Sequence, residues 1–126
     1  MIKELFIVSL FLTFIISRVS AHWLHDRENY RKNEKSKTIT GWLRRITGQD
    51  WHHIHFGLII LLILIPLVSL NGLTKSLTIF LAVGLSLVID QIAPLLGFGN
   101  YFSRKMLIVS ILIHLITALI GIFMLS

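Results

Sequence analysis

The sequence predicts an all-α polytopic membrane protein: an antiparallel bundle of four transmembrane helices with one interfacial amphipathic helix. Hydrophobic residues make up 55% of the 126 residues, and the mean hydropathy of +0.81 is too high for an ordinary soluble domain of this size. The apolar residues gather into four runs, each near the roughly 20 residues that a helix needs to cross a bilayer. Most charged residues lie between these runs. The length suits a single membrane domain, residues 1–126.

The first span is expected over residues 3–24. Its apolar core runs from Leu5 to Ile16 and is followed by Arg18. A removed leader peptide is the alternative, because Val19-Ser20-Ala21 resembles a cleavage site. The apolar run continues to Leu24 at helical spacing, which favours an uncleaved first span.

A polar loop, residues 26–50, follows the first span, and its second half has an amphipathic pattern. Within residues 38–47 the apolar side chains share one helical face, and Arg44 and Arg45 lie elsewhere. This pattern is typical of a helix that lies in the headgroup plane, with Trp42 as an anchor. The apolar face consists of Ile39, Trp42, Leu43 and Ile46.

Three further spans are expected over residues 53–70, 75–96 and 105–125. Asn71-Gly72 predicts a tight turn after the second span. The third and fourth spans are joined by a short loop with two aromatic residues, Phe98 and Tyr101. Short connections favour antiparallel neighbours, so these three spans should run up and down in sequence.

The distribution of basic residues predicts the orientation in the membrane. Ten of the twelve Lys and Arg residues lie in residues 18–50 and 97–105, and only Lys3 and Lys75 lie on the other side. Cytoplasmic loops are enriched in Lys and Arg. We therefore expect a multi-pass cell-membrane protein with residues 18–50 and 97–105 in the cytoplasm and both termini outside.

This orientation brings several histidines to one leaflet, and their spacing suggests a metal site. His22 and His25 are three residues apart, as are His52 and His55, so each pair can share a helical face. Together with Asp90 they supply nitrogen and oxygen ligands that suit a divalent transition metal. The alternative is that these histidines, flanked by Trp23 and Trp51, are ordinary interfacial residues.

Asp90 is the strongest functional candidate, because a carboxylate inside a span costs about 2.5–3.5 kcal/mol on insertion scales and usually faces the protein interior. His114 lies at a similar depth in the fourth span, so Asp90 is expected to bond either to His114 or to His55. A polar clasp that sets helix register is the alternative to a catalytic role. Further polar candidates are Asp26, His53, Tyr101 and His114.

Three segments resemble a group of small, functionally uncharacterised prokaryotic integral membrane proteins. They are His52-His53-Ile54-His55-Phe56-Gly57, Gly84-Leu85-Ser86-Leu87-Val88-Ile89-Asp90-Gln91 and Asn100-Tyr101-Phe102. The group combines an HHxH-type start, a GxGLxLDE-type segment and a VYW-type loop, and the resemblance covers residues 51–110. Gln91 stands where the group tends to have Glu, and Phe102 where it tends to have Trp. The resemblance implies that His53, His55, Asp90 and Tyr101 are the positions of interest.

Composition narrows the classes of function. The chain has no Cys, which excludes disulfides, thiolate metal sites and a Cys nucleophile. The net charge of +6 indicates anionic lipid headgroups rather than nucleic acid, because the basic residues lie between membrane spans. We expect a small subunit or scaffold of a membrane assembly, paired with other subunits or with copies of itself. The alternative is a metal-dependent membrane enzyme or metal-binding protein that acts at lipid headgroups.

Overall fold

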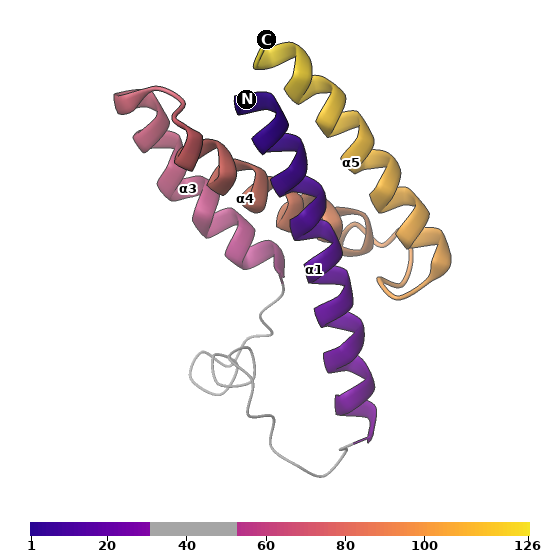
Figure 1. Ribbon diagram of the computed structural model, residues 1–126. Helices are drawn as coiled ribbons and strands as arrows, with labels where there is room; N and C mark the ends of the chain where they lie inside the picture. The colour runs from indigo at the N-terminus through magenta and orange to yellow at the C-terminus, as the bar shows by residue number, and fades with distance from the viewer. Residues whose placement is uncertain (31–52) are drawn as a thin grey trace.

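A computed structural model describes residues 1–30 and 53–126, and the side chains of residues 1–23 and 53–126. These residues form four α-helices: α1 (Ile2–Tyr30), α3 (His53–Asn71), α4 (Lys75–Leu95) and α5 (Arg104–Met124). The expected interfacial helix at 38–47 lies outside the described residues. Both chain termini lie at the same end of the molecule (Figure 1).

All four helices are long and apolar enough to cross a membrane. The candidate spans are Ile2–Trp23, His53–Asn71, Lys75–Leu95 and Arg104–Met124. Each end lies within one residue of the span expected from hydropathy. Helix α1 continues past its span to Tyr30. For the described residues, the prediction of an all-helical chain with four helices long and apolar enough to cross a membrane is confirmed.

The helix ends follow local sequence signals. Thr74 caps α4, since its hydroxyl accepts a hydrogen bond from the Leu77 N–H, and Ser103 caps α5 by accepting from the Met106 N–H. Helix α4 ends at Leu95 with Leu96 as its C-cap, and Gly97 follows with a φ of +83°, which suits glycine. There the N–H of Phe98 donates to the Ala93 carbonyl and that of Gly97 to the Pro94 carbonyl, as in a Schellman motif.

Helix α4 is central, because it packs against α1, α3 and α5. Glycine permits the closest approach: a Cβ on Gly57 of α3 would lie 2.7 Å from the Gly84 carbonyl oxygen of α4. Helix α5 also packs against α1, where Gly121 faces the Phe6 ring. Small residues let membrane helices approach one another in this way.

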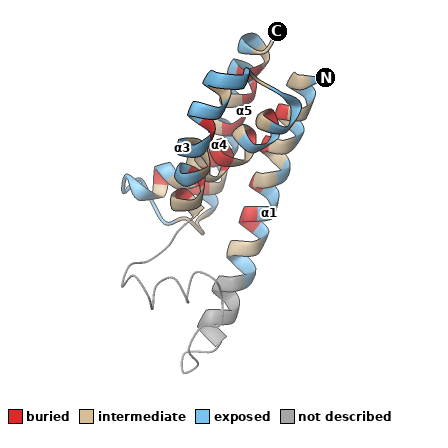
Figure 2. Ribbon diagram, turned by 90° about the vertical axis from the view of Figure 1, so that its left-hand side faces the viewer, coloured by how far each residue is buried: buried red, intermediate tan, exposed pale blue. Residues whose placement is uncertain are grey.

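The distribution of polar and apolar residues is reversed relative to a soluble protein. The interior holds polar side chains, while large apolar side chains cover the outer sides of the helices, for example Leu62 at 71% exposed (Figure 2). The interior also contains a small apolar cluster of Phe6, Leu10, Ala82 and Ala118. This arrangement suits a hydrocarbon solvent, in which backbone and side-chain polar groups must be satisfied internally.

Candidate functional site

The site is built around a buried ion pair between α1 and α4. The Arg18 Nε donates to Asp90 Oδ1 at 2.7 Å. The two side chains are only 6% and 0% exposed. Removing two charges from water is costly unless their remaining hydrogen-bonding groups are also satisfied. The surrounding side chains are therefore as important as the pair.

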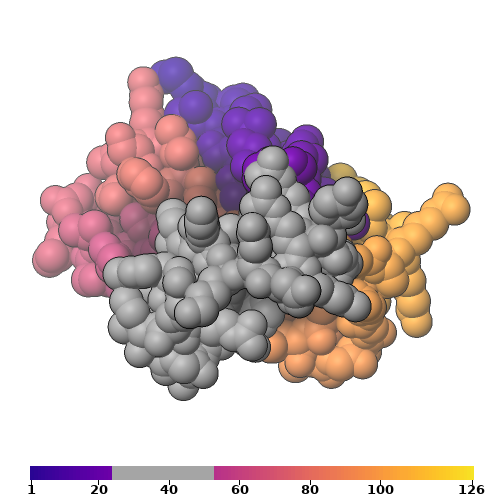
Figure 3. Space-filling view, turned by 90° about the horizontal axis from the view of Figure 1, so that it is seen from below, coloured from indigo at the N-terminus to yellow at the C-terminus, as the bar shows by residue number. Residues whose placement is uncertain are grey.

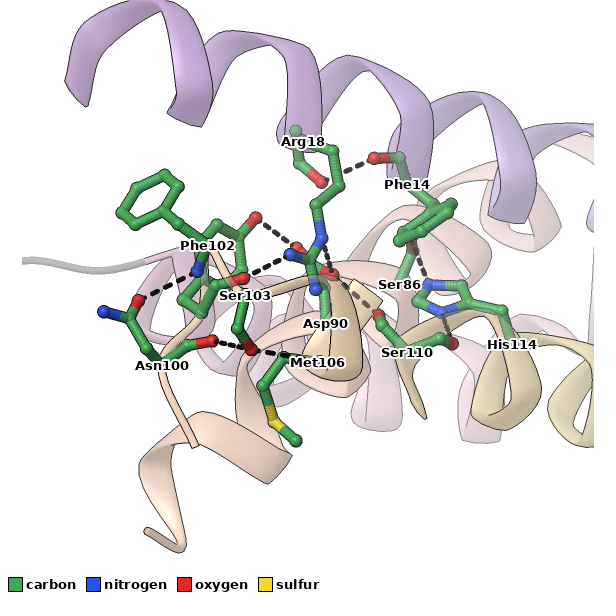
Figure 4. Close-up of polar contacts among 12 residues, drawn as sticks. Phe14, Arg18, Ser86, Asp90, Asn100, Phe102, Ser103, Met106, Ser110 and His114 are labelled. Carbon is green, nitrogen blue, oxygen red and sulfur yellow. Dashed lines mark hydrogen bonds and ion pairs between the residues drawn. The ribbon is translucent and has the colours of Figure 1, made fainter. Parts of the chain in front are cut away.

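Two hydroxyl groups complete the hydrogen bonding of Asp90. Ser110 of α5 donates to Oδ1 at 2.7 Å, and Tyr101 donates to Oδ2 at 2.5 Å. The carboxylate thus accepts from α1, from α5 and from the loop after α4. Figure 4 shows Arg18 and Ser110 converging on Asp90. A metal ion at Asp90 would have to share an oxygen that already accepts a hydrogen bond.

The Arg18 guanidinium is held by the loop as well as by Asp90. Its Nη1 donates to the Tyr101 backbone carbonyl at 2.6 Å, and its Cζ lies 4.0 Å from the centroid of the Tyr101 ring. Such stacking of a cation on an aromatic face is favourable. The Nη2 is buried and has no hydrogen-bond partner among the described residues.

His114 of α5 extends the polar interior along the helix. Its Nδ1 lies 2.7 Å from the Ser110 carbonyl oxygen, and its Nε2 lies 3.0 Å from the Ser86 hydroxyl. A carbonyl oxygen only accepts, so Nδ1 carries the proton, and in the neutral ring Nε2 accepts from Ser86. The Phe14 ring packs on the imidazole at a centroid distance of 4.4 Å.

The pKa of Tyr101 is raised well above its ordinary value. Burial is the main cause, and the hydrogen bond to Asp90 is the second, because a phenolate beside a carboxylate would be repelled. The phenol therefore keeps its proton and acts as a donor to Asp90 over the whole physiological range.

We call these six residues the polar core: Arg18, Ser86, Asp90, Tyr101, Ser110 and His114. They come from α1, α4, α5 and the loop between α4 and α5. One hydrogen-bonded network therefore joins these three helices and the loop. Among the described residues, Arg18 Nη2 is the one buried side-chain nitrogen or oxygen of the polar core without a hydrogen-bond partner. The network links these helices, and both oxygens of the Asp90 carboxylate accept hydrogen bonds.

The predicted histidine cluster is only partly described. His22 is exposed, and its ring lies edge-on to the Phe102 ring with the two centroids 5.1 Å apart. His55 is partly buried, and the His53 ring lies 6.5 Å from that of Tyr101. Within residues 1–23 and 53–126, no three His, Cys, Asp or Glu residues are placed to hold a metal ion. His25, Asp26 and His52 lie outside the described side chains, so the five-residue metal site remains a prediction.

The sequence identified Asp90 but not its partner. Both ring nitrogens of His114 bond elsewhere, so the expected direct Asp90–His114 bond is wrong: Ser110 bridges the two residues. His55 is not among the donors to Asp90. Arg18 was assigned to the cytoplasmic segment, whereas it lies buried inside the first candidate span. An acid inside a membrane span usually pairs with a nearby cation. Arg18 is the basic residue that lies furthest inside an apolar run, residues 3–24.

Comparisons with known proteins give no assignment: no protein-family profile, curated protein or solved structure matches this chain.

Proposed function

We propose that the chain is a non-catalytic membrane subunit, or a scaffold built from copies of itself, whose helices are fixed by the polar core. The observation that carries this proposal is the closure of the Asp90 carboxylate, whose two oxygens accept from Arg18, Tyr101 and Ser110. A catalytic acid needs access to a substrate, whereas a register-setting clasp needs saturated hydrogen bonds.

The outer surface supports a role in assembly. Helix α3 packs chiefly against α4, and the rest of its circumference is apolar and exposed. Lipid or another membrane helix covers such a surface in the bilayer. The large exposed apolar residues of α3 are Leu58, Ile59, Leu62, Ile63, Ile65, Leu67 and Leu70.

The proposed setting is a four-helix bundle in the cell membrane with both termini outside. The loop between α4 and α5 then faces the cytoplasm, together with Arg104 and Lys105 at the start of α5. Residues 26–50, with the proposed interfacial helix at 38–47, face the same side. Anionic headgroups would lie against these basic residues. Figure 3 looks at this end of the molecule, where the segment after α4 reaches the surface.

Site-specific photo-crosslinking in intact membranes tests the assembly. A crosslinking residue replaces Leu62 on α3 or Ile116 on α5, both of which are exposed. We expect a discrete crosslinked species of defined mass from α3, identified by mass spectrometry as a copy of this chain or another membrane subunit. Lipid adducts alone from both positions, together with a monomeric mass in mild detergent, would contradict the proposal.

The metal-binding alternative has its own test. Elemental analysis of the purified protein, with His55→Ala and Asp90→Asn as comparisons, measures bound transition metal directly. Stoichiometric metal that both substitutions remove would replace the scaffold proposal with a metal site at the headgroups. Metal-free protein would leave the polar core as a structural element.

A further inference from the structure

Helix α3 contains a backbone carbonyl without its usual helical donor. Pro66 has no N–H, so the Leu62 carbonyl lacks the hydrogen bond that the fourth following residue donates elsewhere in a helix. Leu62 is 71% exposed and Pro66 is also exposed, so this strip of α3 faces away from α4. The one hydroxyl of α3, that of Ser69, donates to the Ile65 carbonyl instead. Hydrocarbon cannot supply a donor, so the strip favours a donor from another helix.

Helix α1 contains a matching donor. Hydroxyl groups in helices usually donate to a carbonyl of their own helix, as Ser17 and Thr117 do here. The Thr13 hydroxyl makes no hydrogen bond to any part of the chain that the structure describes, and its side chain is only partly buried. Thr13 therefore offers a donor at the surface of α1. Within one chain this donor does not meet the carbonyl, because α3 packs chiefly against α4.

The donor and the acceptor lie at the same depth in their spans. Thr13 is at the middle of the span Ile2–Trp23, and Leu62 is at the middle of the span His53–Asn71. Helices α1 and α3 run in opposite directions (Figure 1), so two copies inserted the same way present them as an antiparallel pair. One turn from each centre, towards the end where both termini lie, Ser9 then comes to the depth of Pro66. A small residue at this position permits close approach.

We propose that α3 of a second copy of this chain packs on α1 of the first, with Thr13 donating to the Leu62 carbonyl. One turn nearer the polar core, the exposed Ile16 of α1 then lies against the exposed Leu58 of α3. The inference rests on the proposed scaffold built from copies and specifies its contact. Because two different surfaces meet, repetition of the contact builds a ring or an open chain.

Paired cysteines test this contact, because the chain has none of its own. Copies with Ile16→Cys and copies with Leu58→Cys, carrying different tags, are coexpressed and oxidised in native membranes with copper phenanthroline. We expect at least about tenfold more mixed disulfide dimer than when Ile15→Cys replaces Ile16→Cys, since only one face of α1 meets the partner. Ile15 is the matched control: it is 55% exposed, against 56% for Ile16, but points about 100° away around the helix.

Substitutions of Thr13 separate the hydrogen bond from the packing. Added to Ile16→Cys, Thr13→Val should lower the yield of mixed dimer at least about fivefold and Thr13→Ser should retain it, since serine keeps the interhelical donor. Equal yields from Ile15→Cys and Ile16→Cys, a dimer from Leu58→Cys alone, or an unchanged yield with Thr13→Val would each overturn the inference. If the paired cysteines fail while position 62 photo-crosslinks to a different membrane subunit, the inference is overturned and the proposed function stands.

Discussion

Arg18 and Asp90 pair across α1 and α4 although 72 residues separate them in the chain. Both side chains are buried in the interior of the protein. This pair links the first span to the central helix, and the remaining polar core extends the link to α5 and to the loop. Five properties of the polar core, of the helix packing and of the membrane orientation can be measured.

Asp90→Asn should destabilise the protein by about 3–5 kcal/mol, because it leaves Arg18 as an uncompensated buried charge. Adding Arg18→Met should recover most of this loss, since the unpaired charge is then gone. The free energy of unfolding in detergent, measured by steric trapping, gives both values. Arg104→Gln removes an exposed charge and serves as the control. A similar stability of Asp90→Asn and the control would contradict a structural role of the pair.

Gly57→Ala should separate α3 from α4, because its Cβ would lie 2.7 Å from the Gly84 carbonyl oxygen, which cannot move aside. We expect a loss of about 1–3 kcal/mol, typical of overpacking. Gly99→Ala is the matched control, since the nearest atoms to its Cβ, at 3.3 Å, would belong to the flexible Met106 side chain. The free energy of unfolding of each variant is measured in detergent. Equal values for Gly57→Ala and Gly99→Ala would disprove the close contact.

The tyrosinate absorbance during an alkaline titration should show one hidden tyrosine. Burial and the Asp90 hydrogen bond raise the pKa of Tyr101 above its usual 10.0. The protein minus Tyr101→Phe difference should therefore show no ionisation near this pH until the protein unfolds. Because the folded pKa exceeds the unfolded one, the stabilisation due to Tyr101 is complete below pH 10.0 and is lost as the pH rises through the folded pKa. A difference signal with a midpoint at the usual value would contradict this.

His114 should be a neutral imidazole with its proton on Nδ1. The Ser110 carbonyl can only accept from that nitrogen, and Ser86 supplies the donor to Nε2. The ¹⁵N chemical shifts of the ring distinguish the two tautomers directly. Ser86→Ala should cost about 1–3 kcal/mol by leaving a buried acceptor unsatisfied. Thr117→Ala should cost less, because the Thr117 hydroxyl on α5 donates to the Ile113 carbonyl of its own helix.

Single cysteines can establish the orientation, because the chain contains none of its own. Asn71→Cys lies at the end of α3, next to the turn to α4, and Phe98→Cys lies in the loop between α4 and α5. A membrane-impermeant maleimide should label residue 71 in intact cells and residue 98 only after permeabilisation. The reverse pattern would show that the positive-inside assignment is inverted.

The spans could be predicted from the sequence to within one residue because hydropathy alone decides where a helix can cross a bilayer. Asp90 could also be identified, since an acid within a span is unusual in any sequence. The reversed distribution of polar groups follows from the same solvent argument.

The partner of Asp90 could not be predicted, because it depends on how each helix is rotated about its axis. Gly57 against Gly84 and Gly121 against Phe6 set these rotations through contacts between distant residues. Arg18 is turned inward, although its position near the end of an apolar run resembles that of a topology signal. The bond of Tyr101 to Asp90 depends in turn on the loop geometry set by Gly97.

The separation of Arg18 from its counter-ion also affects how the protein is made. The first segment leaves the ribosome well before α4, and at ordinary synthesis rates of about 5–20 residues per second the delay is roughly 4–14 s. During that interval the nascent guanidinium must be accommodated at the translocon or near the lipid headgroups. Final seating of the first helix thus waits for the central one, which makes late steps of biogenesis sensitive to any lesion at position 90.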